Sequence, residues 1–314
     1  MSLAAVVIGR NEGARLVACL DALRGQVGEV VYVDSGSTDG SVAAAEARGA
    51  RVVALDMTRP FTAARARNAG IAALSETVTL VQVLDGDCVL QDGWLAEAEA
   101  FLAAHPEVAV VCGRRREVAP EASVYNRLID AEWDTPVGEA LACGGDALIR
   151  RAALAEVGGY REDLIAGEEP EMCVRLRQKG WKIWRLDAEM TRHDAQILRL
   201  GQWWQRTKRA GFAFAQGADI HGAPPERHWV RETRRALLWG VALPVAILLA
   251  VLVFGPGGAL LALVYPLQVA RLALRGGLPW AVLTVLGRFA EAQGALAFLW
   301  RKRRGGAAEL IEYK

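Results

Sequence analysis

Apolar positions in the first half of the chain form short runs that alternate with helix-like patterns. Between the first two runs, Leu16, Leu20 and Leu23 recur on one face of a helix, and residues 63–74 also have a helical pattern. Strands separated by helices of this kind imply parallel pairing with right-handed crossovers, so we expect an α/β fold. The apolar runs that predict strands are residues 3–8, 30–33, 51–55, 78–84 and 108–112.

Two of the predicted strands end in acidic residues. Asp34 follows the run at 30–33, and Asp85 and Asp87 follow the run at 78–84. In open α/β sheets the ligand lies outside the carboxyl ends of the strands. Two separate stretches of sequence are therefore expected to bring carboxylates to one edge of one sheet.

From about residue 236 the polar positions nearly disappear. Residues 236–254 are almost wholly apolar and roughly long enough to span a bilayer, and residues 259–274 form a second, shorter stretch after a Gly/Pro connector. Both outer ends are basic, which predicts a membrane hairpin with both ends in the cytoplasm; a buried pair of core helices is the alternative. The flanking arginines are Arg231, Arg234, Arg235, Arg271 and Arg275.

A third apolar stretch, residues 280–300, is interrupted by Arg288 and Glu291 and precedes the basic run 301–304. We expect it to lie in the membrane interface with the basic run against anionic lipid, the alternative being a third spanning helix. The sequence thus predicts a catalytic domain at 1–225 and a membrane-anchoring region at 226–314.

Composition changes this picture little. Hydrophobic residues make up 53% of the 314 residues, and the excess is concentrated in the C-terminal region. The net charge of +1 gives no reason to expect a nucleic-acid partner. The five cysteines form no CxxC pair and predict buried thiols in a reducing compartment. Signal-peptide features are missing at the N-terminus, so we expect the first domain to face the cytoplasm.

The residues of the two acidic turns suit either ligand binding or an ordinary structural role. Asp85 and Asp87, separated by a glycine, can face a divalent cation and ribose hydroxyls, since Mg²⁺ and Mn²⁺ prefer oxygen ligands; a solvated turn has the same sequence. Ser37 and Asp39 suit a helix N-terminus that binds phosphate or is simply well capped. Of these residues, only Asp34 is not needed to cap the helix.

Several motifs in register resemble those of family 2 glycosyltransferases. The resemblance covers roughly residues 3–215 and implies a GT-A fold and transfer with inversion at the anomeric carbon. The motifs are VIGRNE at 7–12, VDSGSTDG at 33–40, ARNAG at 66–70, DGD at 85–87, GG at 144–145, RR at 150–151, VGGY at 157–160 and GEEPE at 167–171.

The resemblance also implies roles for single residues on the donor side. Asp34 would contact the base of a nucleotide sugar, Asp85 its ribose, and Asp87 together with His193 would hold Mg²⁺ or Mn²⁺ between the phosphates. A UDP-sugar is the favoured donor and a GDP-sugar the other possibility. The remaining donor-binding candidates are Asn11, Glu12, Arg67 and Asn68.

The general base is predicted from the GEEPE motif. Glu169 stands where the family usually has an aspartate, and Glu168 is the other candidate; both also suit the first turn of a helix for electrostatic reasons. A second departure from the family is Ser35, where many members have a further aspartate.

Acceptor-side candidates lie in two places. Gly144, Gly145 and Asp146 belong to the first, and the second is similar to the aromatic-plus-arginine motif of processive members, although paired tryptophans also suit a membrane interface. The residues of the second are Trp203, Trp204 and Arg206.

The function predicted is therefore a metal-dependent, hexosyltransferase-type enzyme at the cytoplasmic membrane. Its acceptor would be lipid-linked or a glycan, in the synthesis of envelope polysaccharide or glycolipid. A dinucleotide oxidoreductase is disfavoured because residues 9–13 read GRNEG rather than GxGxxG, and a sugar nucleotidyltransferase because the glycine-rich basic loop is missing. A catalytically silent membrane-bound scaffold of the same fold remains the alternative.

Overall fold

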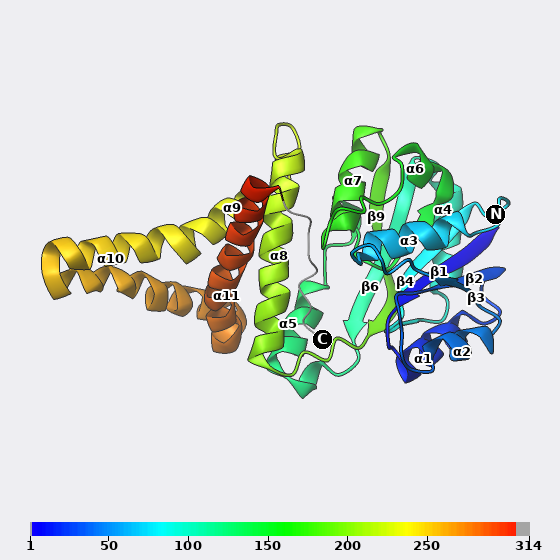
Figure 1. The fold of residues 1–314 in the computed structure, drawn as a ribbon, viewed down its shortest axis with the longest axis horizontal. Coiled ribbons are helices and arrows are strands. Elements are labelled where there is room, and N and C mark those ends of the chain that lie inside the picture. The colour runs from blue at the N-terminus through cyan, green and yellow to red at the C-terminus, as the bar shows by residue number, and fades with distance from the viewer. Residues whose placement is uncertain (1, 306–314) are drawn as a thin grey trace. The chain divides into compact units, whose positions relative to one another are not determined.

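A computed structural model describes residues 2–305 of the chain, which form two compact units (Figure 1). The first unit comprises the residues up to Leu164 and Glu168–Gln196, and the second comprises Ile165–Gly167 and the residues from Ile197 onward. Residues 306–314, the end of the predicted membrane-anchoring region, lie outside the described residues.

The first unit is built on a mixed sheet with the strand order β3-β2-β1-β4-β8-β6-β9-β5, and β7 pairs with β9. The first four strands in this order are parallel, whereas β8 is antiparallel to both of its neighbours. The α/β expectation is confirmed, and the five predicted apolar runs correspond to β1, β2, β3, β4 and β6. The strands are β1 (Leu3–Gly9), β2 (Glu29–Asp34), β3 (Arg51–Ala54), β4 (Leu80–Asp85), β5 (Cys88–Leu90), β6 (Val108–Glu117), β7 (Gly138–Ala140), β8 (Ala147–Arg150) and β9 (Lys182–His193).

Helices cover both faces of this sheet (Figure 1). Strand β1 is consequently buried from Ala4 to Ile8, as a central strand covered on both faces must be. The helices of the first unit are α1 (Ala14–Leu23), α2 (Ser41–Glu46), α3 (Ala63–Ala72), α4 (Trp94–Ala104), α5 (Val124–Glu132), α6 (Arg151–Glu156) and α7 (Glu168–Gln178).

The register of the parallel strands aligns their carboxyl ends. Gly9 at the end of β1 lies opposite Asp34 at the end of β2, and Ile8 lies opposite Asp85 at the end of β4. The predicted edge with carboxylates from two strands is therefore present, with β1 between them.

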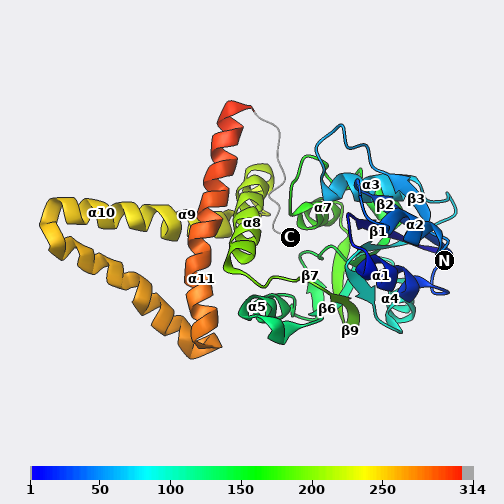
Figure 2. The same cartoon turned by 60° about the horizontal axis from the view of Figure 1, so that its bottom comes forward.

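The second unit is helical. It contains α8 (Leu200–His221), α9 (Val230–Leu237), a π-helical turn (Leu238–Ala242), α10 (Leu243–Phe254), a 3-10 segment (Gly255–Leu263) and α11 (Val264–Arg304). Helix α11 breaks at Gly277, whose φ of 80° is not helical, two residues before Pro279. Figure 2 shows α10 leading away from α9 and the first part of α11 returning from the 3-10 segment.

The outgoing and returning helices carry the predicted hairpin. Large apolar side chains stay exposed along them, including Leu252 at 72% and Leu274 at 89%. The stretch Val230–Arg304 is long and apolar enough to cross a membrane, and only 6% of its most apolar window is buried. We therefore keep the hairpin as a membrane element, with its orientation a prediction.

Helix α8 packs with the C-terminal helices of the second unit. Glycines permit the close approach: a Cβ atom at Gly211 of α8 would overlap the backbone of Glu291, and one at Gly294 of α11 the backbone at Lys208. The sequence-based boundary at 225/226 differs from this division, since the packed units separate after Gln196. The functional division into a catalytic and an anchoring region remains a prediction.

Residues 280–300 are the part of α11 that α8 covers. Small and apolar side chains such as Ala281, Ala290, Ala295 and Phe298 are buried there, and Phe298 contacts Phe212 of α8 edge to face. One face of this segment is thus packed against α8 within the same unit. Contact of the other face and of residues 301–304 with lipid remains a prediction.

Close packing of α3 on the sheet gives a stability prediction. A Cβ atom at Gly70 would overlap the side chain of Val6 and lie 2.9 Å from Cγ2 of Val33. We expect Gly70→Ala to lower the free energy of unfolding by about 1–3 kcal/mol, the usual cost of overpacking a core, measured by thermal melting. The matched control is Gly201→Ala in α8, where open space surrounds the position; an equal loss there would contradict the packing explanation.

Candidate active site

The buried guanidinium group of Arg67 joins three carboxylates at the carboxyl edge of the sheet. Its Nη2 atom donates to Oδ1 of Asp85 at 2.8 Å, and its Nη1 atom lies 2.7 Å from Oε1 of Glu168 and 2.8 Å from Oε1 of Glu169. Burial alone would lower the pKa of Arg67, but the three carboxylates outweigh it and raise the pKa well above its usual value. Arg67 therefore fixes the end of β4 against the start of α7.

A second arginine supports the same edge. Nη2 of Arg115 lies 2.7 Å from Oδ2 of the fully buried Asp146 and 3.7 Å from Oδ2 of Asp85. Asp146 also accepts hydrogen bonds from the hydroxyl of Thr191 at 2.7 Å and from the backbone N–H of Asp85 at 3.2 Å. All of these partners of Asp146 belong to the fold itself, and the bond to Asp85 fixes the DGD turn. An acceptor-side role for Asp146 remains a prediction.

The two glycines before Asp146 differ in surroundings. A Cβ atom at Gly145 would lie 2.8 Å from Nη2 of Arg67 and 2.9 Å from Oδ2 of Asp85, whereas one at Gly144 would meet nothing within 4 Å. The absence of a side chain at Gly145 therefore lets the Arg67–Asp85 ion pair pack against the backbone. At Gly144 a side chain would extend into open space.

Asp34 is held by its own turn. Oδ2 accepts the backbone N–H groups of Gly36 and Ser37 at 3.0 and 2.9 Å, and Oδ1 accepts the hydroxyl of Tyr32 at 3.0 Å. Gly36 has a φ of 82°, which lets the chain turn back onto the carboxylate. The aspartate is thereby held in one orientation at the end of β2, and its contact with a donor base remains a prediction.

Asn11 joins the two loops beside Asp34. Its backbone N–H donates to Oγ of Ser37 at 2.9 Å, and its Oδ1 accepts the N–H of Thr38 at 2.8 Å. Glu12 pairs with Arg15 at 2.7 Å and packs beneath Gly86 of the DGD turn. Both residues thus shape the loops around the site, and direct donor contacts by them remain predictions.

Asn68 is engaged in the fold. Its amide accepts the N–H of Tyr160 at 2.9 Å and donates to the carbonyl of Tyr160 at 2.8 Å. The contact explains the GGY motif, because a Cβ atom at Gly159 would lie 2.7 Å from Oδ1 of Asn68. The structure thus gives Asn68 a positioning role, and the predicted donor contact is untested.

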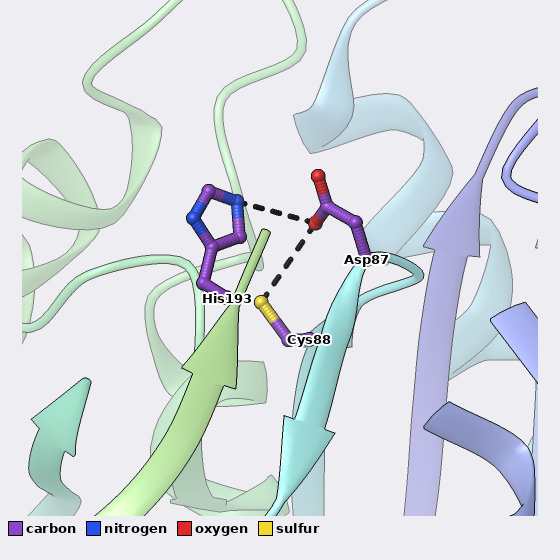
Figure 3. A group of neighbouring side chains, drawn as sticks. All are labelled: Asp87, Cys88 and His193. Atoms are coloured by element: carbon purple, nitrogen blue, oxygen red, sulfur yellow. Dashed lines mark hydrogen bonds and ion pairs between the residues drawn. The ribbon is translucent and has the colours of Figure 1, made fainter. Parts of the chain in front are cut away.

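Asp87, Cys88 and His193 meet at the ends of β5 and β9 (Figure 3). Nε2 of His193 lies 3.3 Å from Oδ1 of Asp87, and Sγ of Cys88 lies 3.8 Å from the same oxygen. His193 is buried, and Trp133 packs edge-on against its ring at 4.8 Å. The two predicted metal ligands are thus adjacent, although they are 106 positions apart in the sequence.

This pair fits a divalent metal ion. Two atoms bound to one metal at about 2.1 Å lie about 3.0–3.4 Å apart, depending on geometry, and the observed separation of 3.3 Å is in this range. Charge also favours a cation, since five carboxyl groups surround two guanidinium groups, those of Arg67 and Arg115. The carboxyl groups belong to Asp85, Asp87, Asp146, Glu168 and Glu169.

Glu169 is more exposed than Glu168, and its pKa is raised. The side chain of Glu169 is 12% exposed against 5% for Glu168, and both lie in the first turn of α7. Burial, followed by repulsion from Glu168, raises the pKa of Glu169 to about 7, although Arg67 lowers it. A carboxylate that titrates near neutral pH is suited to accept a proton, which favours Glu169 as the base.

The aromatic pair of the other acceptor-side motif lies in the second unit. Trp203 is buried next to Gly287, and Nε1 of Trp204 donates to Oε1 of Gln293 at 3.0 Å. Both tryptophans therefore help to pack α8 on α11. Acceptor contacts by Trp203, Trp204 and Arg206 remain predictions.

Arg115 and Thr191 are site residues that the sequence analysis did not identify. The run Arg114-Arg115-Arg116 follows the apolar residues of β6, and three cations at the end of a buried strand are a signal that could have been used. Arg115 also stacks over Trp133 at 5.3 Å. Thr191 carried no signal, because its role depends on the pairing of distant strands.

Comparison with known proteins gives the same family as the motifs. The model of Glycosyl transferase family 2 matches residues 5–158, which contain Asp34, Arg67, Asp85 and Asp87. The remaining residues of the site, from Glu168 to His193, lie beyond the match.

Two curated relatives are bacterial enzymes. A pre-mycofactocin glycosyltransferase of Mycobacterium tuberculosis is 28% identical over 69% of this chain, and an O-antigen chain rhamnosyltransferase of Salmonella typhimurium is 23% identical over 62%. The matches cover 47% and 67% of those proteins, so the chain spans about half the length of the first.

Solved structures share the fold. A mannosyltransferase from Pyrobaculum calidifontis, in complex with GDP-Man and Mn²⁺, superposes with a TM-score of 0.62 at 20% identity over 96% of this chain and 87% of that one. Glucosyl-3-phosphoglycerate synthase from Mycobacterium tuberculosis, with Mn²⁺ and UDP-glucose, gives 0.51 at 19% identity over 71% and 80%. At these identities the likeness is one of fold.

The neighbouring glycines at 144 and 145 provide a matched test of the site geometry. We expect Gly145→Ala to lower the free energy of unfolding by about 1–3 kcal/mol, because the added methyl group must displace the Arg67–Asp85 ion pair. Gly144→Ala should change it by less than about 0.5 kcal/mol. Equal melting temperatures for the two variants would show that the ion pair does not occupy the space beside Gly145.

Proposed function

Because residues 5–158 belong to glycosyl transferase family 2, we propose that the chain is an inverting, metal-dependent glycosyltransferase that uses a nucleotide-sugar donor. The observation that carries the proposal is the convergence of Asp34, Asp85, Asp87 and His193 on one edge of the sheet, next to the Arg67 cluster. A fold kept only as a scaffold does not require this concentration of buried charge, which is costly unless it is used or fully paired.

In the proposed reaction Asp34 contacts the donor base, and Asp85 the ribose. Asp87 and His193 would hold a divalent cation, Mg²⁺ or Mn²⁺ as the family resemblance implies. That cation would offset the negative charge on the leaving nucleoside diphosphate. The support for this arrangement is the order of the motifs and the 3.3 Å separation of the two metal-ligand atoms.

Glu169 is the proposed base. Its carboxylate takes the proton of the acceptor hydroxyl as the hydroxyl oxygen attacks the anomeric carbon, and the nucleoside diphosphate leaves from the opposite side. Arg67 keeps Glu169 close to Asp85, so base and donor site are held at a constant separation by one guanidinium group.

The donor and acceptor are proposed from relatives and from location. Similar folds bind GDP-Man or UDP-glucose in their solved complexes, which supports a UDP- or GDP-sugar. Relatives named for O-antigen and succinoglycan synthesis, together with the apolar hairpin, support a lipid-linked or glycan acceptor in envelope polysaccharide or glycolipid synthesis. The basic flanks of the hairpin favour a catalytic unit on the cytoplasmic side of the membrane.

The pH dependence of donor turnover tests the base. We expect kcat/KM to fall tenfold per pH unit below about 7 and to level off above it, because Glu169 acts only when deprotonated and its pKa is raised to about 7. Glu169→Gln should reduce donor turnover by about 10²–10⁴-fold and remove this pH dependence. The measurement is consumption of a matched nucleotide sugar by the detergent-purified protein.

Glu168→Gln is the control for this test. It removes a neighbouring negative charge that raises the pKa of Glu169, so the profile should persist with a lower midpoint. Loss of turnover in Glu168→Gln together with near-normal turnover in Glu169→Gln would make Glu168 the base. A protein that is folded but consumes no donor would support the scaffold alternative.

Membrane association is tested by charge on the exposed face of α10. Leu249 and Leu252 are 54% and 72% exposed, and an aspartate in a spanning helix costs about 2.5–3.5 kcal/mol. We expect the double variant Leu249→Asp, Leu252→Asp to shift from the carbonate-washed membrane fraction to the soluble fraction. The control is Val118→Asp, at a 54% exposed position of the first unit, and this variant should stay in the membrane fraction. If the double variant also stays in the membrane fraction, residues 243–254 do not anchor the protein.

A further inference from the structure

Cys88 is part of the Asp87–His193 cluster, yet the proposed reaction gives it no role. It begins β5, and the antiparallel register with β9 places Cys88 directly opposite His193. Residues directly opposite on antiparallel strands carry their side chains on the same face, with Cβ atoms about 4.5–5.5 Å apart. Backbone pairing thus positions a thiol and an imidazole side by side, and Asp87 is the residue immediately before Cys88 (Figure 3).

Two separations within the cluster are close to those of a tetrahedral site. In tetrahedral zinc sites, with bonds of about 2.0–2.1 Å to nitrogen and oxygen and about 2.3 Å to sulfur, ligand atoms lie about 3.4 Å (N to O) and about 3.6 Å (S to O) apart. The observed distances from Oδ1 of Asp87 are 3.3 Å to Nε2 of His193 and 3.8 Å to Sγ of Cys88. An octahedral ion bound at about 2.1 Å would require about 3.0 Å for each neighbouring pair of oxygen or nitrogen ligands.

We propose that Asp87, Cys88 and His193 form a three-ligand metal site with a thiolate, which selects a thiophilic divalent ion such as Zn²⁺ over Mg²⁺. The imidazole and thiolate ligands suit zinc, whereas Mg²⁺ prefers oxygen ligands. Formation of the metal–sulfur bond displaces the thiol proton, which passes to solvent. Three protein ligands would leave a fourth position of a tetrahedral ion free for an exogenous ligand, as in catalytic zinc sites.

The sulfur of Cys88 also lies near a second group of acids. Asp85 and Asp146 each offer an oxygen that, with Sγ of Cys88, makes a set of atoms within 4.8 Å of one another. Both carboxylates are already paired with arginine, Asp85 with Arg67 at 2.8 Å and Asp146 with Arg115 at 2.7 Å. The guanidinium groups repel a cation at that position, so the geometry favours the side of Asp87 and His193.

The inference rests on the part of the proposed function in which Asp87 and His193 bind a metal ion, and it replaces the Mg²⁺ or Mn²⁺ expected there by a thiophilic ion. It adds a ligand that alters metal preference, and it does not depend on which sugar is transferred or on whether Glu169 is the base.

The test is titration of the reduced, detergent-purified full chain with Co²⁺, a spectroscopic substitute for Zn²⁺. We expect a thiolate-to-cobalt charge-transfer band in the near ultraviolet and the intense visible bands of a tetrahedral ion. Cys88→Ser should lose the near-ultraviolet band. Cys112→Ser, which removes a buried thiol on β6 outside the cluster, should keep it.

Affinities measured by competition provide the second readout. Cys88→Ser and Cys88→Ala should each weaken Zn²⁺ binding by at least about tenfold and change Mg²⁺ binding by less than about threefold, since only the soft ligand is lost. Unchanged melting temperatures confirm that the variants are folded.

Three outcomes would overturn the inference. Wild-type protein that binds Co²⁺ or Mn²⁺ without the charge-transfer band would remove Cys88 from the site and leave the proposed function intact. A band that persists in Cys88→Ser would assign the thiolate to another cysteine. Protein that is folded and binds no divalent ion would overturn both this inference and the metal-dependent function.

Discussion

Arg67 is the residue on which the geometry of the site depends. Its guanidinium group is 3% exposed and contacts Asp85 at the end of β4 and Glu168 and Glu169 at the start of α7. Loss of one partner of such a buried cluster leaves charge without compensation, which typically costs about 3–5 kcal/mol. Burial within this cluster, followed by repulsion from Glu168, raises the pKa of Glu169. The excess of carboxylates over guanidinium groups at this edge also favours a cation at Asp87.

The parallel pairing of β1, β2, β3 and β4 could be predicted from the sequence, whereas the pairing of β6, β8 and β9 could not. Continuous apolar runs mark strands buried on both faces, and the order of runs and helices implies parallel pairing, so Asp34 and Asp85 could be assigned to one edge. Strands β6, β8 and β9 pair across long separations, as in the bond from Thr191 to Asp146. Local patterns carry no information on such pairing, so the positions of Arg115, Thr191 and Cys88 relative to the acids required the structure.

Helix α8 shows a second limit of sequence patterns. The sequence analysis placed these residues in the catalytic domain at 1–225, and no sequence pattern specified which part of the chain covers them. Small residues explain why α8 packs on α11, because Gly211 and Gly294 let the two backbones approach closely. The resemblance to the family reaches Trp203 and Arg206, so the predicted acceptor-side motif is carried by the unit that contains the apolar hairpin.

The central claim is that this edge of the sheet binds a nucleotide sugar through a metal ion. Equilibrium binding of UDP-, GDP- and dTDP-sugars to the detergent-purified protein, with and without Mn²⁺, tests it most directly, with Asp87→Asn as the companion variant. The account predicts that at least one donor binds only when the metal is present, and that Asp87→Asn loses this binding at an unchanged melting temperature. Absence of binding to every donor by folded protein, or normal metal-dependent binding by Asp87→Asn, would contradict it.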